Sequence, residues 1–172
     1  MGRHGAGPYR RGVNFPSITP NKDYESMLDS YRDLIDGLLP TPTTLQDILG
    51  AQVGDASPER RALLHEARVR EAVNLRRAQS IMRNQRVMLL AIEDEPEMVA
   101  LRAGDAQESN PDEDLATFSH DRSELISLLV NLTLKDWERP VDHDRTGDTT
   151  LADEIEDHLT WDEDLVARLT AA

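Results

Sequence analysis

The chain has 172 residues, 38% of them hydrophobic, with a formal net charge of −14 at pH 7. That is enough for one domain with its own core. Aromatic residues make up only 4% and cysteine is absent, which disfavours all-β folds and excludes disulfides and thiolate sites. The pI near 4.7 argues against nucleic acid as a partner, because binding to phosphates needs a basic surface. No apolar run approaches the length of a membrane span or fits a signal peptide, so we expect no membrane partner and a cytoplasmic protein.

The first twenty residues differ in character from the rest of the chain. Residues 1–20 contain glycines and prolines at short intervals, together with Arg3, Arg10 and Arg11 and no acid. Such a density of helix breakers fits neither a helix nor a strand. The sequence therefore predicts an extended or disordered N-terminal arm over 1–20 and a single domain over 21–172.

Helical spacing of apolar residues dominates the first half of this domain. It predicts a first helix over 21–38, and a short helical turn over 45–49 that Gly50 ends. Ser57 can cap a helix that Pro58 starts, which predicts a long second helix over 58–83. We expect a further helical stretch over 87–90 and a polar loop over 104–116.

The second half of the domain also has apolar residues at helical spacing. Ser119 is expected to cap a third helix, which carries several leucines and is stopped by Pro140. Residues 141–148 are expected to form a polar turn, after which Thr149 or Thr150 caps a fourth helix reaching Leu169. Four amphipathic helices predict an all-α four-helix bundle.

One acid of the fourth helix stands out. Asp162 interrupts a stripe that is otherwise apolar, and His158 lies four residues before it, so the two side chains adjoin on one helical face and could share a metal ion or a proton. An aspartate in such a place is usually at the edge of the stripe in water, and we favour that interpretation over a site. His65 on the second helix is a further candidate ligand.

Charged residues elsewhere carry weaker signals. Residues 105–172 hold nineteen acids and five bases, a pattern typical of a solubilising surface or, alternatively, of a patch for a basic partner. The second helix is rich in arginines. We expect them to form a solvated face and to pair with acids of the other helices. An anion site built by an inward-leaning subset is the alternative. These arginines are Arg68, Arg70, Arg76, Arg77, Arg83 and Arg86.

The segment 121–169 resembles the C-terminal half of the DinB/YfiT-like four-helix family. The likeness rests on a Leu-x-x-x-Asp-Trp turn ending at Trp137, a Gly-x-x-Thr-Leu cap from Gly147 to Leu151, and the His-Leu pair at His158. Upstream, Ser57 and Pro58 followed by a helix with His65 are similar to the second helix of that family.

The resemblance implies a four-helix bundle, often dimeric, whose members include metal-dependent thiol transferases and isomerases and many proteins without a known activity. It also implies three histidine ligands, one on the second helix and two spaced four apart on the last. His65 matches the first, but the pair falls on Asp162 and Val166, with His158 one turn earlier. Valine cannot bind a metal. Either nickel, zinc or iron is held by His65, His158 and Asp162, or the site is lost, and we favour loss.

Three functions follow. The first is a protein of this type that binds a small ligand in the bundle cavity, with a lost or altered metal site. The second is a metal-dependent thiol S-transferase or hydrolase that uses His65, His158 and Asp162. The third is an acidic protein-interaction module. The sequence does not decide whether the chain is an enzyme, and a homodimer is expected from the resemblance alone.

Overall fold

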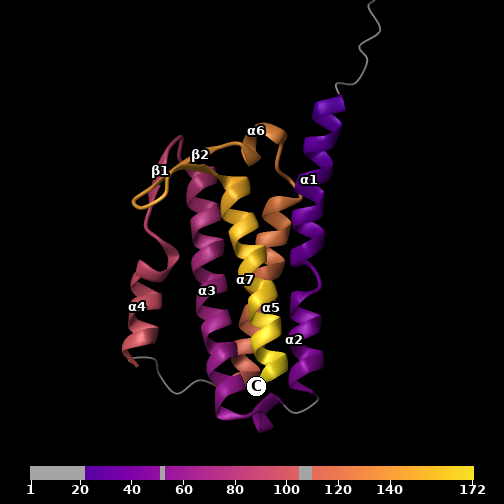
Figure 1. The fold of residues 1–172 in the computed structure, drawn as a ribbon, viewed down its shortest axis with the longest axis vertical. Helices are drawn as coiled ribbons and strands as arrows, with labels where there is room; N and C mark the ends of the chain where they lie inside the picture. Colours follow the sequence, from indigo (N-terminus) through magenta and orange to yellow (C-terminus); the bar gives the residue numbers. More distant parts are fainter. Residues whose placement is uncertain (1–21, 51–52, 105–109) are drawn as a thin grey trace, which may run out of the picture.

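The computed structural model describes residues 22–50, 53–104 and 110–172, so the expected arm over 1–20 lies outside the described residues. Four long helical rods lie side by side (Figure 1). They are α1 (Lys22–Leu38) continued by α2 (Thr41–Leu49), then α3 (Pro58–Arg83), α5 (Pro111–Leu129) and α7 (Leu151–Ala171). The predicted all-α four-helix bundle is confirmed. No helix within the described ranges is long and apolar enough to cross a membrane.

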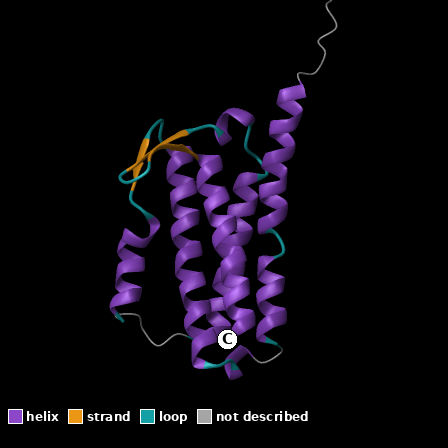
Figure 2. Ribbon diagram, viewed as in Figure 1, coloured by secondary structure: helices purple, strands orange, loops and turns teal. Residues whose placement is uncertain are grey.

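Smaller elements connect the rods. A 3-10 turn (Val53–Asp55) precedes α3, and another (Ile92–Asp94) precedes α4 (Pro96–Ala103), which lies along the outside of the bundle next to α3. A three-stranded sheet and α6 (Leu134–Trp137) cover one end of the bundle (Figure 2). The strands are β1 (Val87–Leu89), β2 (Pro140–His143) and β3 (Gly147–Thr150), with β1 parallel and β3 antiparallel to β2.

This sheet corrects two predictions. The helical stretch expected over 87–90 was wrong, because Val87 to Leu89 pair with Val141 to His143, far along the chain, and local spacing carries no signal for such pairing. The polar turn expected over 141–148 is a β-hairpin instead. Gly147 permits its tight turn, since φ there is +80°, a conformation that costs glycine little.

The loop expected over 104–116 was wrong from Pro111 onward, and residues 105–109 lie outside the described part of the chain. Helix α5 begins at Pro111, and the side chain of Asn110 accepts a hydrogen bond from the Asp112 amide as its cap. The expected cap Ser119 therefore lies inside α5, where its hydroxyl donates to the Leu115 carbonyl. An asparagine followed by proline signals either a turn or a capped helix start. Here it starts a capped helix, whose first turn includes the buried residues Pro111 and Asp114.

Several other helix ends are as expected. Ser57 Oγ accepts a hydrogen bond from the Arg60 amide, and Gly50 ends α2 with φ +81°. At the start of α7, Thr150 Oγ1 accepts from the Asp153 amide while Asp153 Oδ2 accepts from the Thr150 amide. This reciprocal pair is a capping box.

Replacing Thr150 with alanine should lower the free energy of unfolding by about 1 kcal/mol, because the first-turn amide loses its acceptor. Chemical unfolding followed by circular dichroism would measure the loss. Thr170→Ala is the matched control, since Thr170 is exposed in the last turn of the same helix and its hydroxyl donates to the Val166 carbonyl instead of accepting from a first-turn amide. Equal effects of the two replacements would contradict this role of Thr150.

The apolar core consists of two clusters, one toward each end of the bundle. One contains Leu38, Leu125 and Ile155 among others, and the second contains Leu64, Phe118 and Leu165 among others. On every rod the residues of the two clusters are separated by polar positions, which build the candidate site.

Candidate functional site

A layer of polar side chains divides the core at one level of all four rods. No member of this central polar layer is more than 5% exposed. Their positions on the helices face the interior of the bundle, where amphipathic helices normally carry apolar residues. The layer consists of Thr41 on α2, Glu71 on α3, Arg122 on α5, and His158 and Asp162 on α7.

Arg122 lies at the middle of the central polar layer. Its Nε and Nη2 donate to the two carboxylate oxygens of Glu71, both at 2.8 Å, in the bidentate geometry that suits a guanidinium. Its Nη1 donates to Asp162 Oδ2 at 2.7 Å and to the Leu38 carbonyl at 2.8 Å. The guanidinium also lies 5.0 Å from the centre of the Phe118 ring. One cation therefore joins α1, α3, α5 and α7.

The remaining members complete the layer. Asp162 Oδ2 also accepts a hydrogen bond from Thr41 Oγ1 at 2.7 Å. His158 Nε2 lies 2.9 Å from Glu71 Oε2, and its Nδ1 lies 2.6 Å from the side-chain amide of Asn74. The buried charges thus have partners on several sides, as buried ions require.

These contacts determine the protonation states of Glu71 and Arg122. Burial by itself raises the pKa of the Glu71 carboxyl, but attraction to His158 and hydrogen bonds from Arg122 and His158 outweigh it and hold that pKa at about 2. Burial lowers the pKa of the Arg122 guanidinium, yet hydrogen bonds with Glu71 and Asp162 and their charges raise it above its usual value. Both groups therefore stay charged at neutral pH.

The structure brings together two of the three candidate metal ligands. His158 and Asp162 share the central polar layer, and Asp162 is 2% exposed, so our preference for an aspartate in water was wrong. His65 is elsewhere: its Nδ1 lies 3.0 Å from Asp114 Oδ2 on α5. Val166, at the position that the resemblance gives to the second histidine of the pair, lies off the inward stripe and is only partly buried.

With Arg122 in place, these residues do not fit a divalent cation. The atoms that would bind one, Asp162 Oδ2 and the oxygens of Glu71, are already within 2.8 Å of guanidinium nitrogens. A cation among them would coincide with a fixed positive charge. Across the described ranges, no group of three or more histidine, aspartate and glutamate side chains could hold a metal ion.

Sequence reasoning missed Arg122 and Glu71, although a signal was present. Arg122 follows the buried Phe118 by four residues and precedes Leu125 by three, which is the inward rhythm of a helix. Because charged residues are almost never fully buried unless paired, an arginine at such a position predicts a buried partner. The partner itself lies on another helix.

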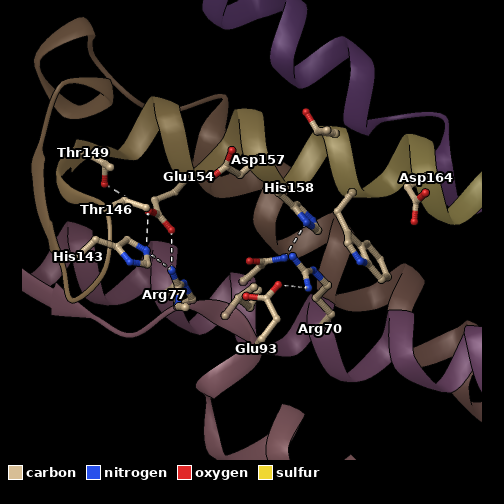
Figure 3. A pocket seen from close by; sticks show the side chains of 15 residues that line it. Arg70, Arg77, Glu93, His143, Thr146, Thr149, Glu154, Asp157, His158 and Asp164 are labelled. Carbon is tan, nitrogen blue, oxygen red and sulfur yellow. Dashed lines mark hydrogen bonds and ion pairs between the residues drawn. The ribbon is translucent and has the colours of Figure 1, made fainter. Parts of the chain in front are cut away.

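Beside this layer, a pocket of about 440 Å³ opens between α3 and α7. His158 and Asn74 line it, so they form the wall shared with the central polar layer. The hairpin and the segment before α4 close its sides, through His143 and Glu93. On α7 the lining residues recur at helical spacing from Glu154 to Asp164 (Figure 3).

Arg77 holds the walls of this pocket together. Its Nη1 donates to the Leu90 carbonyl at 2.7 Å and to Glu95 at 3.0 Å, and its Nη2 donates to Glu154 at 2.7 Å. It therefore ties α3 to the segment before α4 and to α7. With its nitrogens engaged and 5% of its surface exposed, Arg77 has a structural role.

Arg70 is less fully engaged. It is 8% exposed, and its carbon Cζ lies 4.7 Å from the centre of the Trp161 ring. Its Nη1 is 3.4 Å from Glu93 Oε1, a long hydrogen bond, and its Nε has no hydrogen-bond partner among the described residues. Burial lowers its pKa. Among the arginines of α3, Arg70 and Arg77 are buried, so our expectation of a solvated face was wrong for these two.

Comparison with known proteins supports the fold. No protein-family model and no curated protein matches the sequence. Among solved structures, the chain is similar to YfiT from Bacillus subtilis, with a TM-score of 0.67, 18% identity, and coverage of 95% of this chain and 93% of that one. YfiT is described as a probable metal-dependent hydrolase with an unusual four-helix bundle topology. The bundle implied by the resemblance of segment 121–169 is thus confirmed.

Proposed function

We propose that the protein binds a small polar ligand in the pocket between α3 and α7, and that it does so without a metal ion in the bundle. The observation that carries the proposal is the unused hydrogen-bonding capacity in the pocket walls. Arg70 Nε and His143 Nδ1 are buried without a hydrogen-bond partner in the described part of the chain, and both residues line this pocket. Buried polar groups are nearly always partnered, and a ligand that reorients these side chains would supply partners.

The position of the pocket supports the same conclusion. Ligand sites in bundles lie between helices, where a few polar groups converge within a mostly apolar wall. Trp161 offers such an apolar surface next to Arg70. YfiT is described as a probable metal-dependent hydrolase, but here two of the three candidate metal ligands, His158 and Asp162, contact Arg122.

Ligand binding is testable through Trp161. The chain has two tryptophans, and Trp137 stacks on Tyr31 in the core, away from the pocket. In a Trp137→Phe variant, saturable changes in Trp161 emission should accompany binding of at least one compound from a panel of small polar metabolites. A panel that leaves both the emission and the melting temperature unchanged would contradict the proposal.

Metal content separates this function from the metal-dependent one. Untagged protein should contain nickel, zinc and iron well below one ion per chain, and EDTA should leave its melting temperature unchanged, because Arg122 fills the position of a cation. Elemental analysis by mass spectrometry makes the measurement. One ion per chain that disappears in His158→Ala, but not in His120→Ala, would overturn the proposal and support a site that includes His158.

A further inference from the structure

The pocket has buried arginines at its inner end and exposed acids at its mouth. Its two cations, Arg70 and Arg77, are at most 8% exposed. Three of its four acids, Glu93, Asp157 and Asp164, are exposed, so they surround the mouth. The fourth, Glu154, is partly buried and is paired with Arg77. Because Arg77 is paired with Glu95 and Glu154, a ligand that enters meets negative charge at the mouth and the positive charge of Arg70 inside.

The inner end favours an anionic group. Arg70 contributes the Nε that lacks a partner in the described residues, and its remaining contacts are the long bond to Glu93 and the ring of Trp161. A carboxylate can accept two parallel hydrogen bonds from a guanidinium. It would replace the weak contact to Glu93 with a stronger one.

The mouth favours a cationic group. Asp157 lies one turn before Trp161 on α7, which places it on the same side as the ring that stacks on Arg70. Burial raises the pKa of Asp157, and the neighbouring acids Glu154, Asp153 and Glu156 raise it further. An incoming ammonium group would relieve this repulsion.

Charge balance selects between ligand classes. A dianion such as a phosphate ester would be repelled at the mouth by three carboxylates, and a simple amine would be repelled inside by Arg70. A molecule that carries one group of each sign meets neither cost. Its carboxylate would lie toward Arg70 on α3 and its ammonium group toward Asp157 on α7, the two helices that border the pocket.

We propose that the pocket binds a small zwitterion, an amino acid or ω-amino acid whose carboxylate contacts Arg70 and whose ammonium faces Asp157. This inference rests on the proposed function, because it names the chemical class of the ligand in the same pocket. The pocket volume of about 440 Å³ accommodates a molecule of this size.

Matched probes test the class. The full chain is titrated by calorimetry with a series from glycine to 6-aminohexanoate, and with butyrate and butylamine as the one-charge counterparts of 4-aminobutyrate. At least one zwitterion should bind, at least about tenfold more tightly than its one-charge counterparts, because each lost ionic hydrogen bond weakens binding by about that factor. Ligands of one charge that bind as tightly as the zwitterion would overturn the inference.

Two variants then test which residue binds each charged group of the ligand. Arg70→Met should weaken the zwitterion and butyrate by about tenfold or more, and Asp157→Asn should weaken the zwitterion while leaving butyrate unchanged. Arg83→Met, at the exposed end of α3, is the control. If the wider metabolite panel yields a ligand but no zwitterion binds, this inference fails and the proposed function stands. If nothing binds, both fail.

Discussion

Replacing Arg122 with methionine is expected to lower the free energy of unfolding by about 3 to 5 kcal/mol, the usual cost of removing one partner from a buried ion pair. The loss arises because Glu71 and Asp162, which are 0% and 2% exposed, are left in the core without the cation that they contact. Urea unfolding monitored by circular dichroism would measure the change. Arg32→Met removes an exposed pair with Asp29 and should change stability by less than about 0.5 kcal/mol.

A triple variant distinguishes buried charge from lost packing. Adding Glu71→Leu and Asp162→Leu to Arg122→Met removes the carboxylates that the single variant leaves without a cation. Apolar groups of similar volume often substitute for a buried ion cluster without loss, so the triple variant should be more stable than Arg122→Met. A triple variant that is less stable than the single one would contradict the argument. This comparison remains informative even if Arg122→Met is partly unfolded.

The protein should lose stability as the pH falls below about 4.5, and Glu71 should account for much of the loss. Its pKa is about 2 in the folded chain against 4.5 as the ordinary value. A carboxyl whose folded pKa is depressed stabilises fully above the unfolded value, and the stabilisation disappears as pH falls toward the folded value. The shift corresponds to about 3 kcal/mol.

Glu71→Gln isolates this contribution. The variant should be less stable than the wild type at pH 6, because the amide provides neither the charge nor both acceptors for Arg122. Between pH 4.5 and 3 its stability should fall less steeply than that of the wild type. Other carboxyls with lowered pKa values, such as those of Glu97 and Asp136, act in both proteins and cancel in the difference. Parallel curves would refute the role of Glu71.

Two expectations stay predictions. The homodimer implied by the family resemblance and the acidic patch expected to bind a basic partner are tested by neither the fold nor the comparisons. The fold does show where many of the acids of the C-terminal third lie. Several of them are engaged within the chain, since Glu154 contacts Arg77, Asp162 contacts Arg122 and Asp142 contacts Arg86.

Short-range interactions along the sequence determined the four rods and several of their ends. The periodic apolar residues of α1, α3 and α7, the cap Ser57 and the stop Gly50 are short-range signals, because helix hydrogen bonds and caps join residues at most a few positions apart. The same periodicity placed His158 and Asp162 on one face of α7. It also contained the inward positions of Arg122 and Glu71, which we did not interpret as buried.

Only the tertiary structure decided which charges share the core and where the pocket lies. Arg122 and Glu71 are separated by 51 positions and Arg122 and Asp162 by 40, and no local pattern specifies such partners. The pairing of β1 with β2 depends likewise on chain segments brought together by the bundle. The physical reason is that a charge can be buried only where another helix places an opposite charge next to it. The position of such a charge is therefore determined by the assembled fold.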